Sequence, residues 1–236
     1  MSEPKIEEAR KRSVDNLQRL YTVVVSLAVT ESLKPLLGGL ARGEALPGYN
    51  RWFMFASLVI TVVPFYHGAN RYLDATYVTG ERAAKPQALL IDFVMLFIEG
   101  IAFFALAMLA NDEQVFYTGL AMLLVFDAGW VGITNLTGAS VSDRFPDYAK
   151  WASVNLVVAA MICVSVWANL PWTTPGGTGF WRSQFTRDVA LLILVVGRTF
   201  YDYWKVWPFY YPQDRAVVFS GIPAPAPARP PEVTTH

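Results

Sequence analysis

The chain has 236 residues, of which 54% are hydrophobic and only 16% are charged. Soluble domains normally carry about 25% charged residues, so this composition favours a membrane protein. The formal net charge is +0, which provides no basic surface for nucleic acid. A single cysteine excludes an intramolecular disulfide, and two histidines exclude multi-histidine metal centres. We therefore expect no metal site, no cofactor and no nucleic-acid partner.

The N-terminal segment is charged rather than apolar, and it lacks the pattern of a cleavable signal peptide. Residues 1–19 mix charged and apolar side chains, which predicts a cytoplasmic amphipathic helix leading into the membrane. A first hydrophobic run follows at residues 20–40, interrupted by Glu31, Lys34 and Pro35. Glu31 and Lys34 are three residues apart, a spacing at which they can pair on one helix face.

Further apolar runs cover residues 51–66, 88–109, 115–136, 151–170 and 188–207. Each is close to the roughly 20 residues that a helix needs to cross hydrocarbon. The sequence therefore predicts an all-α fold, a polytopic membrane helical bundle of about six transmembrane helices within residues 20–207. Residues 208–236 are rich in proline and alanine, a composition typical of a disordered tail.

Basic residues predict the orientation of the bundle. They are concentrated in the N-terminal segment, in the second and fourth loops and in the tail, so both termini are predicted to be cytoplasmic. Trp151 and the aromatic residues crowding the last helix fit an aromatic belt at the inner membrane surface. We expect an integral protein of a plasma membrane, specifically a bacterial inner membrane. The lipid bilayer is its predicted partner, and a homo-oligomer or other membrane subunits are candidate partners.

Residues 59–77 begin as an apolar helix and then turn polar without a strong stop signal. Pro64 can kink the helix because proline lacks a backbone N–H. His67, Asn70, Arg71 and Asp74 follow at spacings that form one stripe on a continuing helix. This stripe is either a polar cavity wall or a helix end that runs into water, with Arg71 reaching the lipid head groups.

Charged side chains also lie inside the predicted spans, where each costs roughly 2.5–3.5 kcal/mol at the bilayer centre. Arg198 and Asp202 have the spacing of an intrahelical ion pair. Asp92, Glu99 and Asp127 have no basic partner nearby in the sequence. Such acids can pair across helices, carry a proton, or hold a cation. The alternative is polar glue, in which acids, tyrosines and Asn155 hydrogen-bond between helices.

With the predicted orientation, most of these polar groups fall in the cytoplasmic half of the membrane. We therefore predict a polar cavity that faces the cytoplasm, with Glu99 and Asp127 at its floor. Its candidate residues are His67, Asn70, Arg71, Asp74, Asp92, Glu99, Asp127, Asn155, Arg198 and Asp202. Whether the cavity continues outward past Glu31 distinguishes a conduit from a closed pocket.

Several enzyme signatures are absent from the sequence, including HExxH, GxSxG, the phosphate-binding loop and the dinucleotide-binding GxGxxG. No catalytic residue is assigned, and an enzyme is not the first expectation. The leading hypothesis is a small channel or transporter for protons, cations or a small cationic solute. The alternatives are a membrane-embedded sensor, assembly partner or effector, and an intramembrane enzyme acting on a lipid or isoprenoid. In the enzyme, His67, Asp74 or Asp92 would have acid/base roles.

Overall fold

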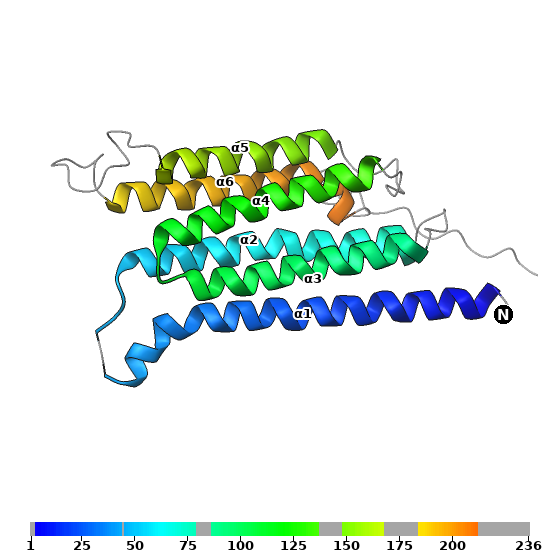
Figure 1. Cartoon of the computed structure of the whole chain (residues 1–236), viewed down its shortest axis with the longest axis horizontal. Coiled ribbons are helices and arrows are strands. Elements are labelled where there is room, and N and C mark those ends of the chain that lie inside the picture. The colour runs from blue at the N-terminus through cyan, green and yellow to red at the C-terminus, as the bar shows by residue number, and fades with distance from the viewer. Residues whose placement is uncertain (1–2, 44, 79–85, 137–147, 168–183, 212–236) are drawn as a thin grey trace, which may run out of the picture.

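The computed structural model describes residues 3–43, 45–78, 86–136, 148–167 and 184–211. Within these ranges the chain forms helices that run along the long axis of the molecule (Figure 1). They are α1 (Glu3–Ala41), α2 (Tyr49–Leu73), the short π-helix η1 (Asp74–Val78), α3 (Pro86–Leu109), α4 (Glu113–Leu136), α5 (Tyr148–Trp167) and α6 (Gln184–Tyr210). The predicted all-α helical bundle is confirmed.

Five of the described helices are long and apolar enough to cross a membrane. The candidate spans are Glu8–Gly39, Tyr49–Val78, Ala88–Leu109, Glu113–Ile133 and Lys150–Trp167. Many of their large apolar side chains point away from the bundle; Met122 is 69% exposed and Leu90 is 64% exposed. An apolar outer surface of this extent is stable against lipid rather than water. The chain is thus a multi-pass membrane protein.

α6 lies in the same bundle, yet it is not among the candidate spans because it carries more charged residues. Asp188, Arg198 and Asp202 are nevertheless buried, at 1%, 3% and 2% exposure. They share one helical stripe with the buried residues Leu191 and Val195, at the three- and four-residue spacing of a helix face. α6 therefore turns its charges into the bundle. The sixth membrane crossing stays a prediction.

α1 is a single helix of 39 residues, about 58 Å long at 1.5 Å per residue. This is longer than the roughly 30 Å hydrocarbon core of a bilayer. The predicted boundary between residues 19 and 20 lies inside this helix. Its last turns bend away from the bundle (Figure 1), near Pro35, because proline removes a backbone hydrogen bond.

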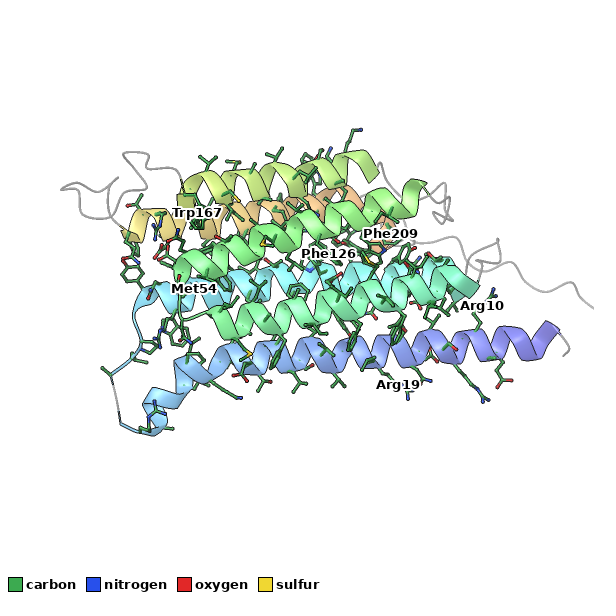
Figure 2. All side chains as sticks on the ribbon, in the orientation of Figure 1. Arg10, Arg19, Met54, Phe126, Trp167 and Phe209 are labelled. Atoms are coloured by element: carbon green, nitrogen blue, oxygen red, sulfur yellow. The ribbon has the colours of Figure 1, made fainter. Side chains whose placement is uncertain are left out.

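α2 and α6 lie side by side and run in the same direction. Rings of Tyr49 and Phe185 meet at one end, with centroids 5.1 Å apart, and rings of His67 and Tyr210 stack at the other, 4.5 Å apart. The end where α6 finishes at Tyr210 is called the cavity end below, and the opposite one the far end. In Figure 2, Phe209 marks the cavity end and Met54 lies towards the far end, with side chains filling the space between the helices.

The polar stretch of residues 59–77 is helical throughout, as predicted. α2 continues through Pro64 and passes directly into η1. The predicted tail lies outside the described residues from residue 212 onward, and residues 208–210 belong to α6.

Candidate functional site

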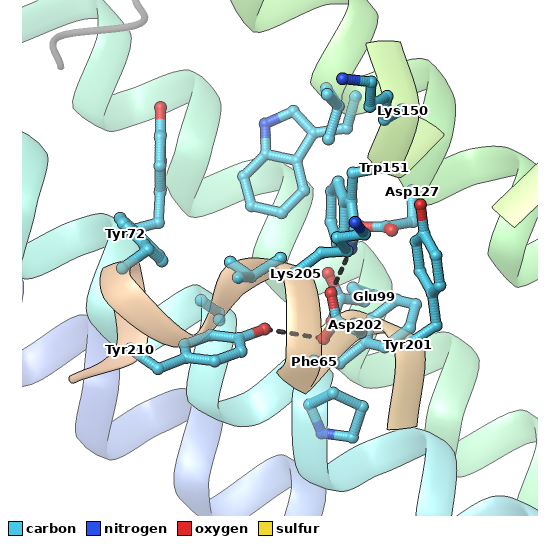
Figure 3. A pocket seen from close by; sticks show the side chains of 17 residues that line it. Phe65, Tyr72, Glu99, Asp127, Lys150, Trp151, Tyr201, Asp202, Lys205 and Tyr210 are labelled. Carbon is cyan, nitrogen blue, oxygen red and sulfur yellow. Dashed lines mark hydrogen bonds between the residues drawn. The ribbon is translucent and has the colours of Figure 1, made fainter. Parts of the chain in front are cut away.

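A cavity of about 300 Å³ lies at the cavity end, between α2, α3, α4, α5 and α6 (Figure 3). This volume is at the lower end of the range typical of small-ligand pockets. The walls are mainly apolar and aromatic. The charged side chains that line the cavity are Glu99, Asp127, Lys150, Asp202 and Lys205.

Asp202 is held in the cavity by side chains from two helices (Figure 3). The indole Nε1 of Trp151 on α5 donates a hydrogen bond to its Oδ1 at 2.6 Å. The Tyr210 hydroxyl, two turns further along α6, donates to its Oδ2 at 2.8 Å. Both donors also line the cavity. Trp151 and Tyr210, which the sequence placed in an aromatic belt, therefore position a cavity carboxylate.

Asp127 on α4 is joined to Arg198 on α6 through a buried amide on α5. The Nδ2 of Asn155 donates to Oδ2 of Asp127 at 2.6 Å, and Nε of Arg198 donates to Oδ1 of Asn155 at 2.9 Å. The Arg198 guanidinium also lies over the Phe65 ring, 4.8 Å from its centroid. Its two terminal nitrogens have no hydrogen-bond partner among the described residues. The expected direct ion pair between Arg198 and Asp202 is wrong, because Asp202 bonds to Trp151 and Tyr210 instead.

Glu99 on α3 receives its hydrogen bond from α1. The hydroxyl of Tyr21 donates to Oε1 of Glu99, and both side chains are buried. The Tyr21 ring stacks on the Tyr66 ring of α2, with centroids 5.9 Å apart, and the Tyr66 hydroxyl lies 2.9 Å from Thr22 Oγ1. Tyr21 lies in the first predicted span, so α1 supports Glu99 from behind the cavity wall. Nothing in the sequence singled out Tyr21.

The three cavity carboxylates share one feature: their hydrogen bonds come from neutral donors. Within the described residues, none of Glu99, Asp127 and Asp202 has a lysine or arginine nitrogen within ion-pair distance. The buried Arg198 reaches Asp127 only through Asn155. The three cavity acids therefore have no direct ion pair among the described residues.

Asp92 lies behind the cavity wall rather than in it. The Tyr77 hydroxyl donates to Oδ2 of Asp92 at 2.6 Å, and the Trp130 indole donates to Oδ1 at 3.3 Å. Trp130 itself lines the cavity. Asp92 thus orients a wall residue by linking α3 to η1 and α4.

The polar stripe of α2 divides between two neighbours. His67 and Arg71 face α6: the His67 Nδ1 lies 3.2 Å from the Tyr203 hydroxyl, and the Arg71 Nε donates to the Phe209 carbonyl at 2.9 Å. Asp74 faces α1, where the side-chain amide of Gln18 donates to Asp74 Oδ1 and to the backbone carbonyl of Asn70. The Asn70 side chain donates to the backbone carbonyl of Tyr66 on its own helix.

None of the four stripe residues is among the side chains that line the cavity. The cavity face of α2 consists instead of Pro64, Phe65, Gly68, Ala69 and Tyr72. The structure therefore brings Glu99, Asp127 and Asp202 into the cavity, with Asn155 and Arg198 directly behind them. His67, Arg71 and Asp92 contact wall residues from outside, whereas the Asp74 side chain and the Asn70 backbone carbonyl accept hydrogen bonds from α1.

Glu31 and Lys34 pair as predicted, with Lys34 Nζ 2.5 Å from Glu31 Oε2. They line a separate pocket towards the far end, together with Pro35, Arg42 and Arg51. This pocket and the cavity have no lining residue in common.

The far end contains a second charged cluster that the sequence did not reveal, in which Asp188 is buried and Arg187 and Glu113 are partly buried. Arg187 on α6 forms an ion pair with Glu113 on α4, and its Nε lies 3.7 Å from Asp188 Oδ1. Both Asp188 carboxylate oxygens are buried without a hydrogen-bond partner in the described chain. Tyr117 and Ser57 lie deeper, with their hydroxyls 3.3 Å apart. Glu113 begins α4, and nothing in the sequence links it to α6.

No family model, curated protein or solved structure matches the chain, so the function has to be argued from the chemistry of the cavity.

Proposed function

We infer that the protein is a membrane transporter that binds a small cationic solute in its cavity and exchanges it for protons. The observation that carries this proposal is the set of buried carboxylates of Glu99, Asp127 and Asp202, which line one cavity and bond to neutral donors. A neutral donor fixes the position of a carboxylate without cancelling its charge. A buried acid in this state is stabilised by a proton or by a bound cation.

Among the described residues, the cavity does not merge with the pocket at Glu31, which favours a carrier over an open channel. An open channel requires a continuous route, whereas the cavity and the pocket at Glu31 have no lining residue in common. A carrier instead exposes one site alternately to the two sides of the membrane. In the predicted orientation, this cavity opens to the cytoplasm of a bacterial cell.

The enzyme alternative loses its proposed acid/base groups. His67, Asp74 and Asp92 are not among the side chains that line the cavity. His67 packs against tyrosine rings, and Asp92 bonds to Tyr77 and Trp130. Binding and exchange of a cation are therefore the chemistry that this cavity supports best.

Proton flux into liposomes tests the proposal. The purified protein is reconstituted around a pH-sensitive dye, and outward gradients of sodium, potassium or tetraethylammonium are imposed at two external pH values. Wild type should show proton uptake driven by at least one of these cations. Glu99→Gln and Asp127→Asn should abolish it, because each amide preserves shape but cannot bind and release a proton at neutral pH.

Glu31→Gln is the matched control, since it removes a carboxylate that lies outside the cavity. It should transport like wild type. Unchanged flux in both cavity variants would overturn the proposal and would identify the acids as interhelical glue. Wild-type protein that moves protons with no cation gradient would be a proton channel instead.

A further inference from the structure

We propose that the solute is an organic ammonium ion, whose charge lies near the cavity carboxylates and whose apolar body packs against aromatic walls. This inference rests on the proposed function, since it names the class of molecule that the same cavity carries. It distinguishes such an ion from a bare metal cation, an anion and a neutral apolar molecule.

The carboxylates are poorly arranged for a metal ion. No group of three histidine, cysteine or acidic side chains in the described chain is placed to hold one. Calcium and magnesium need several oxygen ligands in a compact shell, but Glu99, Asp127 and Asp202 come from three helices and bond to separate donors. Diffuse positive charge suits this arrangement better than a small, strongly hydrated ion.

The walls supply the second half of the recognition. Aromatic rings from four helices line the cavity: Phe65, Tyr72, Trp130, Trp151, Tyr201, Phe209 and Tyr210. The face of an aromatic ring attracts a cation within about 6 Å, most strongly when water is excluded, and quaternary ammonium ligands are recognised in this way. An ammonium ion with an apolar body satisfies both the acids and the rings.

Two of the protein's own cations already lie over aromatic faces at this end of the bundle, one ring lining the cavity and the other outside it. The guanidinium of Arg198 lies 4.8 Å from the centroid of Phe65, and Nζ of Lys205 lies 4.6 Å from the centroid of Trp204. Both are organic cations with an aliphatic stem. They show that cations are stable against aromatic rings in this part of the bundle.

The competing occupant is an anion, because Lys150 and Lys205 line the cavity and Arg198 lies behind it. Lys150 and Lys205 are exposed, whereas the carboxylates are at most 2% exposed. Desolvated charges interact more strongly than exposed ones. The buried acids should therefore decide the sign of the ligand.

Three probes of similar size and different charge test the inference. They are benzyltrimethylammonium, which has a permanent positive charge, neutral benzyl alcohol, and anionic benzenesulfonate. Thermal unfolding of the intact protein in detergent is followed as each is titrated, with sodium and potassium chloride as ionic controls. Benzyltrimethylammonium alone should raise the melting temperature in a saturable way, because a ligand that binds the folded state stabilises it.

Variants locate the binding. Asp127→Asn should weaken the apparent affinity at least tenfold, and Tyr201→Leu should weaken it several-fold by removing one ring. Tyr201→Phe keeps the ring and should rescue most of that loss. Phe200→Leu, on the same helix but 70% exposed and outside the cavity, is the control and should bind like wild type.

Equal stabilisation by benzyl alcohol, or preferential stabilisation by benzenesulfonate, would overturn the inference, as would sodium or potassium binding that displaces benzyltrimethylammonium. Failure of the proposed function has a different signature. Binding of benzyltrimethylammonium without proton flux in liposomes would reject transport and retain the ligand class. Flux driven by sodium or potassium, without any binding of the probe, would retain transport and reject the ligand class.

Discussion

The cavity and the far end of the bundle both bury acids beside one arginine, but they treat the charges differently. At the far end, Arg187 binds Glu113 directly and lies close to Asp188. In the cavity, Arg198 binds Asn155, and the amide rather than the guanidinium contacts Asp127. The far-end arginine therefore neutralises its acid, whereas the cavity arginine leaves acids available to another cation.

The two clusters are carried by the same helix. Asp188 and Arg198 lie on one buried stripe of α6, separated by the apolar residues Leu191 and Val195. At the far end this helix is fastened to α4 by an ion pair. At the cavity end its Asp202 is hydrogen-bonded to a residue of α5. The difference fits a structural clamp at one end and the proposed binding site at the other.

The largest expected effect comes from breaking the far-end clamp. Arg187→Ala removes the cation beside the partly buried Glu113 and the buried Asp188. Removing one partner of a fully buried pair typically costs about 3 kcal/mol or more, so this partly buried pair should cost up to about 3 kcal/mol. The free energy of unfolding in detergent should fall by this amount. Binding of benzyltrimethylammonium to the protein that remains folded should be unchanged, because the cavity lies at the other end.

Arg12→Ala is the control for this variant. Arg12 also forms an ion pair, with Glu8 at 2.5 Å, but both side chains are exposed, at 74% and 63%. Exposed pairs contribute about 1 kcal/mol or less, so stability should hardly change. If Arg187→Ala abolished ligand binding as completely as Asp127→Asn, the two ends would be one coupled site and the comparison would fail.

An intermediate effect is expected from Asn155→Leu. This change removes the amide between Asp127 and Arg198 and leaves both groups buried without it, which costs about 1–3 kcal/mol for an unsatisfied polar group. Unlike the far-end variant, it should also weaken benzyltrimethylammonium binding, because Asp127 loses the donor that positions it. Ser153→Ala, on the exposed face of α5, should change neither quantity.

Much of the bundle follows from the sequence, because spans are set by the length of apolar runs. The predicted runs at 88–109 and 115–136 differ little from α3 and α4. The pairing of Glu31 with Lys34 was also predictable, since it depends only on spacing along one helix. Glu99 and Asp127 could be singled out because each is an acid deep in an apolar run.

The parts that could not be predicted depend on which helices are neighbours. Spacing placed His67 and Arg71 on one stripe, but it could not show that this stripe faces α6 while Pro64 and Phe65 face the cavity. Spacing also favoured an ion pair of Arg198 with Asp202. Instead, Trp151 of α5 donates a hydrogen bond to Asp202, and Arg198 donates one to Asn155 of α5. Spacing along α6 could not show that α5 lies close enough to make these bonds.

The smallest expected effect tests the role of neutral donors in the cavity. Tyr21→Phe removes the hydroxyl that donates to Glu99. Interhelical hydrogen bonds in membrane proteins contribute about 0.6 kcal/mol on average, so the melting temperature should fall only slightly. Ligand binding should weaken by a factor of a few, because the ionised form of Glu99 loses a stabilising donor.

Tyr66→Phe supplies the matched comparison. Its hydroxyl lies 2.9 Å from Thr22 on α1 and bonds to no cavity carboxylate, so its loss should cost a similar amount of stability while binding stays the same. A parallel response of both variants in stability and in binding would show that Tyr21 acts only by joining helices. A loss of binding confined to Tyr21→Phe would show that a neutral donor keeps a cavity carboxylate ready for a cation, in contrast to the ion-paired Glu113 at the far end.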